Sequence, residues 1–407
     1  MSERTATEKR PKVAIVLTGG GARGAYQVGV LRGMGKLFPN TRFRIVTGVS
    51  AGAINAAWLA SSPDRLGPST GALVRHWEGL EVDRIFGADV GSLGANFFRW
   101  MVHLASGASR LGPRVRGFLD TAPLRDLLME LIGTPGDADG RLHGVERNLE
   151  ADLLEAFALT TVNYGTGQTV SWVESREPVG WTLPNRVSRE VGLTVDHVLA
   201  SSALPLLFPA VQLWSAGESG WYGDGGIRLA APLSPALHLG ADRVIAVSTR
   251  YDRSAAESGS SAISGYPPPA QIVGNLMNAI FLDVLDQDAR RLERLNGLLR
   301  KLQPEARNGL RCVDLVLVRP SEDLGALSAQ LEPTLPAAFR FFTRSFGTRE
   351  TKSPDFLSLL MFQPDYISQL MDIGERDALA REDELRRLLD GSDAEVEASA
   401  LESAASG

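Results

Sequence analysis

The chain has 407 residues, a formal net charge of -6 and one cysteine. Hydrophobic residues make up 44% and charged residues 22%, a balance typical of a globular protein with a sizeable core and one or two domains. The acidic charge argues against a nucleic-acid partner, which needs a broad basic face, and a single cysteine excludes an internal disulfide.

Short apolar runs rich in β-branched residues predict strands, and they alternate with helix-like stretches through the first 250 residues. Strands are expected at 13–18, 43–49, 155–163, 169–174 and 243–250, and helices at 25–38 and 51–60. Several of these strands are apolar on both faces, as strands covered by helices on two sides should be. The alternation therefore predicts an α/β fold with a largely parallel central sheet.

A glycine-rich loop follows the first strand and reads Gly19, Gly20, Gly21, Ala22, Arg23, Gly24. Backbone N–H groups at such a strand-to-helix turn bind anions. The G-x-G-x-x-G spacing is also that of a dinucleotide loop, which needs an acidic residue about 20 positions further on. Residues 25–63 contain no Asp or Glu, so the dinucleotide interpretation is disfavoured.

The second predicted strand ends in the sequence Gly48-Val49-Ser50-Ala51-Gly52, which matches G-x-S-x-G. A serine on a sharp strand-to-helix turn is typical of a nucleophile, and the flanking glycines relieve crowding around a strained backbone. We expect the Ser50 side chain to be exposed. The alternative is that Ser50 only caps an ordinary helix.

A serine nucleophile needs a base, and neither a glycine turn nor a strand end holds a histidine. The five histidines are His76, His103, His143, His197 and His238. His238 lies in a helix-like segment and is more simply structural. Asp224 lies between glycines, in Gly223-Asp224-Gly225-Gly226, where another loop can approach its carboxylate. Taken alone, Asp-Gly also predicts a simple hairpin turn.

The remaining third of the chain has a different composition. Residues 251–269 are dominated by Ser, Gly and Pro and predict a loop. Residues 270–390 are expected to be mostly helical, with a long helical pattern over 270–303 and one strand at 313–320. Cys312, in the strand-like stretch RCVDLVLV, is expected to be a small buried hydrophobe. Residues 1–11 form a polar N-terminal segment, and the small, acidic tail 391–407 is expected to be disordered.

Together these motifs give a resemblance to the patatin-like phospholipase family, and to its bacterial members in particular. The family's hallmarks are a G-G-G-x-R-G oxyanion loop, a G-x-S-x-G nucleophile and a D-G-A/G aspartate, present here as 19–24, 48–52 and 224–226. The resemblance covers residues 12–250, with a further similar stretch at 353–378. It implies a three-layer fold, a dyad of Ser50 as nucleophile and Asp224 as proton acceptor, and an acyl-lipid substrate.

The resemblance implies neither a cofactor nor a metal, and the sequence has no metal-ligand spacing. The polar N-terminus and the lack of an apolar run of ~18–20 residues predict a cytoplasmic chain that makes at most peripheral contact with a membrane. Headgroup, acyl position and oligomeric state are not determined by these motifs.

Three points stay open at this stage. Arg23 either assists electrostatically, pairs with a lipid phosphate or braces its loop through carbonyl contacts. The stripe of Phe97, Trp100, Met101 and Leu104 in 96–107 is either core or a lid over the acyl chains. The rival functions are a non-catalytic anion-binding regulator and a Ser-His-Asp esterase that uses His238.

Overall fold

The structure, a computed structural model, describes most of the chain. The described residues are 11–87, 119–134, 139–215, 217–252, 283–335 and 355–390, with 117, 136, 137, 266, 271, 272, 274–276, 340 and 344 between them. Of the predicted segments, the tail 391–407, the stripe 96–107 and nearly all of 1–11 and 251–269 lie outside these ranges.

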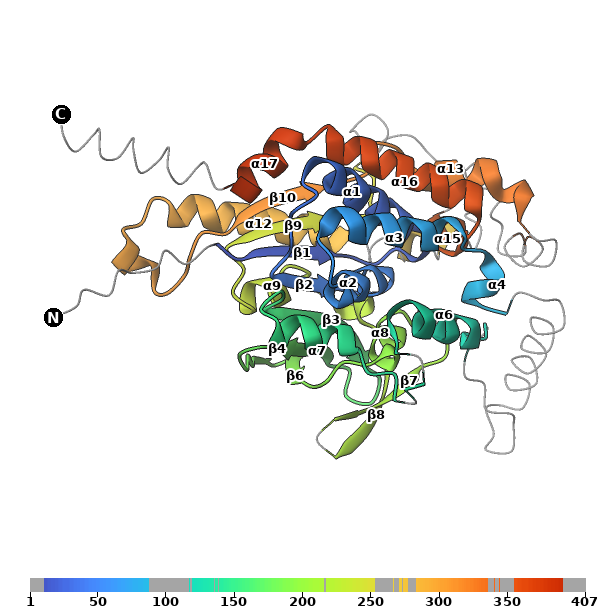
Figure 1. The fold of residues 1–407 in the computed structure, drawn as a ribbon, viewed down its shortest axis with the longest axis horizontal. Helices are drawn as coiled ribbons and strands as arrows, with labels where there is room; N and C mark the ends of the chain where they lie inside the picture. Colours follow the sequence, from blue (N-terminus) through green and yellow to red (C-terminus); the bar gives the residue numbers. More distant parts are fainter. Residues whose placement is uncertain are drawn as a thin grey trace.

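A ten-stranded sheet forms the centre of the molecule (Figure 1). Its strands run in the order β10 (Asp314–Val318), β9 (Arg243–Val247), β1 (Val13–Leu17), β2 (Ile45–Gly48), β3 (Ala156–Asn163), β4 (Thr169–Ser175), β6 (Arg186–Glu190) and β5 (Thr182–Leu183). The first five strands are mutually parallel, and β4 is antiparallel to β3. A hairpin of β7 (Val211–Ser215) and β8 (Glu218–Asp224) joins the end of β3 through antiparallel β8.

Helices cover both faces of the sheet, so the fold has three layers. The helices before residue 250 are α1 (Gly24–Leu37), α2 (Ala51–Ser61), α3 (Leu66–Glu78), α4 (Val82–Ile85), α6 (Ala122–Ile132), α7 (His143–Glu150), α8 (Val195–Ser201) and α9 (Ser234–His238). Those after it are α12 (Asp283–Leu299), α13 (Leu324–Leu331), α15 (Asp355–Leu360), α16 (Pro364–Leu379) and α17 (Glu382–Asp390).

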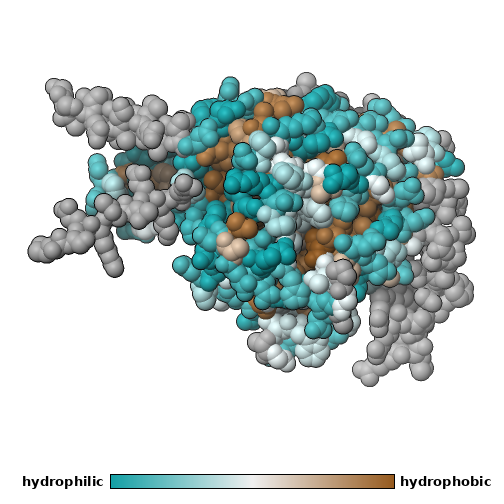
Figure 2. All heavy atoms as spheres, in the orientation of Figure 1, coloured by the Kyte–Doolittle hydropathy of each residue, from teal (hydrophilic) through white to brown (hydrophobic). Residues whose placement is uncertain are grey.

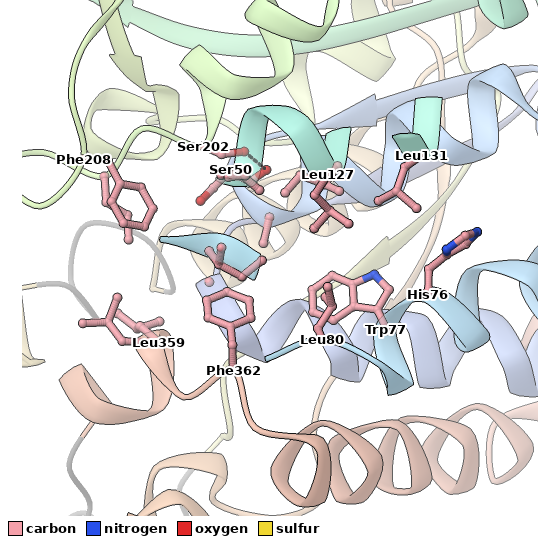
Figure 3. Close-up of a pocket in the computed structure, with 17 residues that line it drawn as sticks. Ser50, His76, Trp77, Leu80, Leu127, Leu131, Ser202, Phe208, Leu359 and Phe362 are labelled. Atoms are coloured by element: carbon pink, nitrogen blue, oxygen red, sulfur yellow. Dashed lines mark hydrogen bonds between the residues drawn. The ribbon is translucent and has the colours of Figure 1, made fainter. Parts of the chain in front are cut away.

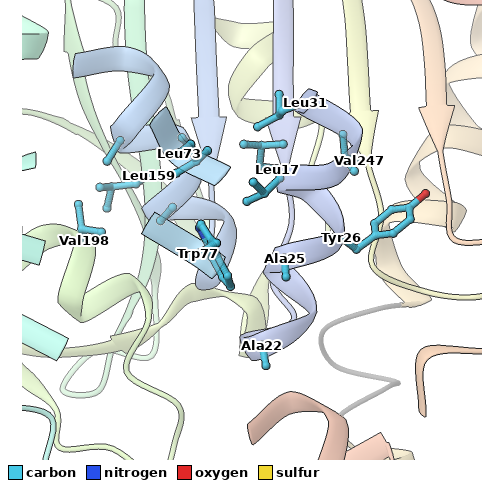
Figure 4. Packing of buried hydrophobic residues seen from close by; sticks show 14 of the residues in the cluster. Leu17, Ala22, Ala25, Tyr26, Leu31, Leu73, Trp77, Leu159, Val198 and Val247 are labelled. Carbon is cyan, nitrogen blue, oxygen red and sulfur yellow. The ribbon is translucent and has the colours of Figure 1, made fainter. Parts of the chain in front are cut away.

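Alternate residues of each buried strand supply two separate cores. In β1, Ile15 and Leu17 face the larger core with α1, α2 and α3, whereas Ala14 and Val16 face the smaller core with α9 and α12. Figure 4 shows Leu17 packed beside side chains of α1 in the larger core. Strands that are apolar on both faces are what such a double cover requires.

The C-terminal helices pack on the same core. Helix α16 lies along α1 (Figure 1), where the buried Tyr26 hydroxyl donates a 2.9 Å hydrogen bond to Asp377. Strand β10 extends the sheet at β9. The division of the chain at residue 250 stays a prediction, and these contacts show how closely the two sides of that boundary are joined.

The predicted fold class is confirmed, since the sheet is mostly parallel and flanked by helices. Each of the six predicted strands is present, with ends that differ by at most three residues. The sequence analysis missed β5, β6 and the β7–β8 hairpin, whose exposed faces weaken their apolar patterns. None of the helices in the described ranges is long and apolar enough to cross a bilayer.

Candidate active site

Ser50 occupies a strained turn between β2 and α2. Its φ and ψ are 57° and -133°, a conformation that residues with side chains rarely adopt. The turn packs so closely on β1 that a Cβ at Gly52 would lie 2.2 Å from the Leu17 carbonyl oxygen. Glycine at 52 is therefore needed to bring the start of α2 against the sheet. This is the geometry that G-x-S-x-G predicts.

The expectation that Ser50 is exposed was wrong, because the residue is only 2% exposed. The reason is that α6, the loop after α8 and the segment around α15 converge above the turn and form the walls of a pocket. Ser50 opens into this pocket rather than into bulk solvent, as Figure 3 shows.

Asp224 is the last residue of β8 and is fully buried. Its Oδ1 accepts a 2.8 Å hydrogen bond from the Gly226 amide. Its Oδ2 makes no hydrogen bond of normal geometry with the described residues, although the Ser50 hydroxyl is near enough to lower the pKa of the carboxyl. Burial outweighs that effect and raises the pKa of Asp224 to about 7. The carboxyl is thus a base suited to neutral pH, with one oxygen available.

Two neighbouring serines at the end of α8 hold the Ser50 turn in place. The Ser50 amide donates to Ser201 Oγ at 3.1 Å, and Ser202 Oγ donates to the Ser50 carbonyl at 3.1 Å. The next residue, Ala203, accepts a 3.0 Å hydrogen bond from the Asp224 amide. One short segment therefore contacts both Ser50 and Asp224. These roles of Ser201 and Ser202 were not predicted, because hydroxyls that bridge distant segments leave no local pattern in the sequence.

The glycine loop runs from the end of β1 through a single 3-10 turn, Gly21–Arg23, into α1. Backbone carbonyl groups at the start of the loop accept hydrogen bonds from side chains. The Thr18 carbonyl oxygen accepts from Gln27 Nε2 at 2.6 Å, and the Gly19 carbonyl oxygen accepts from Thr249 Oγ1 at 2.7 Å. Gly21 has a φ of 54°, and a Cβ there would lie 2.1 Å from the Leu359 carbonyl oxygen. Gly21 lines the same pocket as Ser50.

Arg23 points into the protein, where it pairs with α15. Its guanidinium donates to Asp355 Oδ1 at 2.5 Å and to Ser358 Oγ at 2.7 Å, and its side chain is 4% exposed. Of the roles left open above, this geometry favours a brace for the loop. The contacts are with side chains of the C-terminal part, rather than with carbonyls as the sequence analysis anticipated.

The pocket above Ser50 is apolar. Its walls include Trp77 of α3, Leu80 just after that helix, Leu127 of α6, Phe208 and Phe362. In Figure 2 a hydrophobic strip is visible between α3 and α6. The free space is only about 40 Å³, room for a few water molecules. An acyl chain would enter only if these walls moved apart.

None of the four histidines that the structure describes contacts Ser50 or Asp224. His238 Nδ1 lies 2.8 Å from the Ser234 carbonyl oxygen, and the ring stacks on Trp181. His76 packs on Trp58 at the end of the pocket away from Ser50 (Figure 3). Burial lowers the pKa of His197 to about 4. His103 lies outside the described residues, which also hold no cluster of metal-ligating side chains.

A serine on a strand-to-helix elbow of an α/β sheet is the arrangement typical of one class of serine hydrolases. The sequence model of the patatin-like phospholipase family matches residues 15–237. The chain therefore belongs to that family, and membership supports lipid hydrolase activity.

Solved structures are similar to the chain at low sequence identity. VipD from Legionella pneumophila is 14% identical with a TM-score of 0.39, and the match covers 92% of this chain and 67% of VipD. Human GIVD cytosolic phospholipase A2, in complex with methyl gamma-linolenyl fluorophosphonate, is 13% identical with a TM-score of 0.42. That match covers 94% of this chain and 59% of the human protein, so the chain spans little more than half of it. No curated protein matches the chain significantly.

Proposed function

We propose that this protein is a serine lipid acyl hydrolase, which cleaves carboxylic esters of phospholipids or related acyl lipids through a Ser50–Asp224 dyad. The observation that carries the proposal is a fully buried carboxyl of raised pKa beside a serine on a strained elbow, with the serine lining an apolar pocket. A binding module would have no need for such a base.

In the first half-reaction, Ser50 Oγ attacks the ester carbonyl carbon while Asp224 Oδ2 accepts the hydroxyl proton. The tetrahedral intermediate then collapses, the C–O bond to the alcohol breaks, and the alcohol leaves with the proton from Asp224. In the second half-reaction, Asp224 deprotonates a water molecule that hydrolyses the acyl-enzyme and regenerates Ser50. A pKa of about 7 suits both directions of proton transfer near neutral pH.

The loop Gly19–Gly24 is proposed as the oxyanion hole. The carbonyls of residues 18 and 19 already accept hydrogen bonds from side chains, and Gly21 lines the pocket together with Ser50. The loop also leads into the positive end of α1, which favours a developing negative charge. Arg23 contributes through its ion pair with Asp355, which fixes the loop rather than contacting the substrate.

The residues proposed for the site come from the segment 12–250, which we propose as the catalytic domain, with α15 as a supporting element. A cytoplasmic enzyme that reaches its lipid by peripheral membrane contact fits this proposal. Neither a metal nor a cofactor has a step in it. The alternatives are the non-catalytic anion-binding protein and the Ser-His-Asp esterase with His238.

Covalent labelling tests the proposal. A fluorophosphonate probe should label Ser50, and Ser50→Ala should lose both labelling and ester hydrolysis while its circular dichroism spectrum and melting temperature stay close to the parent's. Ser234→Ala, a hydroxyl change on α9, serves as the control and should keep both. Full hydrolysis by a folded Ser50→Ala protein would overturn the mechanism.

A further inference from the structure

The β7–β8 hairpin projects from the rest of the sheet, at the bottom of Figure 1. Its inner face is buried, with Leu213 and Tyr222 only 3% and 8% exposed. The pairing of Gln212 with Trp221 and of Trp214 with Ser219 places these four residues on the outer face. We call this set, Gln212, Trp214, Ser219 and Trp221, the tryptophan face.

Two large aromatic side chains on the solvent side of a hairpin are unusual, because that side of an antiparallel pair is normally polar. Trp214 is 67% exposed and Trp221 is 49% exposed. The two lie diagonally across the strand pair, within reach of each other. The other two members of the face, Gln212 and Ser219, are uncharged and hydrogen-bonded to each other at 3.2 Å. In Figure 2 the hairpin is the pale projection at the bottom, of intermediate hydropathy.

The tryptophan face lies on the strand that carries Asp224. Trp221 precedes Asp224 by three residues, or about 10 Å, so their side chains point to opposite faces of the strand. Tyr164, which is 46% exposed, donates its amide N–H to the Trp221 carbonyl at 2.9 Å. Burial, and to a smaller extent the charge of Asp224, raises the pKa of the Tyr164 phenol. Exposed aromatic surface therefore continues along the outer face of β8 as far as Gly223, against which the Tyr164 ring packs.

The loop between α8 and β7 adds a second exposed apolar group close to the pocket. Leu206 is 69% exposed and is held outward by a backbone with a φ of 67°. Its neighbours Leu204 and Phe208 line the pocket. A loop with its flanks in the pocket and its tip in solvent places an apolar side chain beside the route that a lipid would take.

We propose that the tryptophan face is the surface on which this protein docks to a phospholipid bilayer. The inference rests on the proposed function, because the acyl-lipid substrate of that function is held in bilayers. Tryptophan suits the boundary between headgroups and acyl chains, since its ring is apolar and its N–H is polar. The face carries no charged side chain, so docking occurs by insertion of the two rings and requires no anionic lipid.

Vesicle flotation tests the docking surface, with Ser50→Ala protein used throughout so that the lipid is not consumed. The parent should float with phosphatidylcholine vesicles. Trp214→Ala/Trp221→Ala should bind at least tenfold more weakly, because each ring contributes a large buried apolar area in the bilayer. Both residues are exposed, so their removal leaves no cavity. Ser219→Glu, which puts a carboxylate opposite Trp214, should weaken binding as well.

The matched control removes exposed apolar surface elsewhere. Leu298 and Leu302, at the end of α12 and just beyond it, are 61% and 42% exposed. Leu298→Ala/Leu302→Ala should bind vesicles within twofold of the parent. The proposal is overturned if the parent does not bind vesicles or if the tryptophan variant binds as well as the parent. It is also overturned if the variant merely converts a dimer to a monomer, since the face would then contact a second copy.

Activity measured in the chain with Ser50 separates this inference from the proposed function. Trp214→Ala/Trp221→Ala should hydrolyse vesicle lipid at least tenfold more slowly, yet hydrolyse a monomeric short-chain ester at the parent rate. Tryptophan-dependent binding without any hydrolysis would support docking and contradict the proposed function. Hydrolysis of vesicles that is insensitive to both tryptophans would do the reverse.

Discussion

The buried ion pair between Arg23 and Asp355 joins the glycine loop to a helix more than 330 residues away. We expect Asp355→Ala to lower the free energy of unfolding by about 3–5 kcal/mol, because it leaves a buried guanidinium without its carboxylate. The two side chains are only 4% and 10% exposed, so water cannot replace the lost partner. Against a typical total of about 5–15 kcal/mol, this is a large loss.

The double variant Arg23→Met/Asp355→Ala separates the charge from the packing. It removes both charges and so leaves no unpaired guanidinium, and we expect it to be more stable than Asp355→Ala alone. Urea unfolding of the parent, both single variants and the double variant gives the coupling energy. Asp372→Ala is the control, because it breaks an ion pair between α16 and α1 in which Asp372 is 68% exposed, and should cost at most about 1 kcal/mol.

The same variants report on catalysis. Because Leu359 of α15 lies directly against Gly21, we expect Asp355→Ala to lower kcat on a monomeric ester more than it changes KM. Asp372→Ala should change neither. The reasoning would be refuted if Asp355→Ala unfolded at the same urea concentration as the parent, or if Asp372→Ala proved equally damaging.

Four further outcomes are expected. Asp224→Asn should lower turnover by several orders of magnitude and His238→Ala should keep most activity; a folded His238→Ala enzyme as inactive as Asp224→Asn would establish a triad instead. The value of kcat/KM should rise with pH up to about 7 and then level off, because Asp224 must be deprotonated to accept the proton. Folding favours the protonated Asp224, so its contribution to stability is lost as the pH rises from about 4 to about 7, by at most about 4 kcal/mol. The difference in urea midpoint between the parent and Asp224→Asn, measured at pH 5 and at pH 8, gives that loss. If this difference is the same at both pH values, the expectation is contradicted. Gly21→Ala should lower kcat at least 100-fold, since its Cβ would meet the Leu359 carbonyl and displace the loop; a Gly21→Ala enzyme with parental kcat would show that the loop is not held there.

Local sequence patterns were sufficient to predict the central strands of the fold. These strands are short, apolar on both faces and rich in β-branched residues, and such properties can be read from a few neighbouring positions. The elbow could be predicted in the same way, because Gly48, Ser50 and Gly52 meet the steric demands of one tight turn. The β7–β8 hairpin escaped prediction because its outer face carries tryptophans and its polar alternation is therefore obscured.

Local sequence thus specifies the mostly parallel sheet and the turn on which Ser50 lies. The rest of the site is completed by contacts between distant parts of the chain. The pairing of Arg23 with Asp355 and the support of Ser50 by Ser201 and Ser202 join segments that are far apart in the chain. The raised pKa of Asp224 likewise depends on complete removal from water, which is a property of the packed molecule. Contacts of this kind arise when the sheet and its helices assemble, since burial and hydrogen bonding across the chain have no counterpart in local sequence.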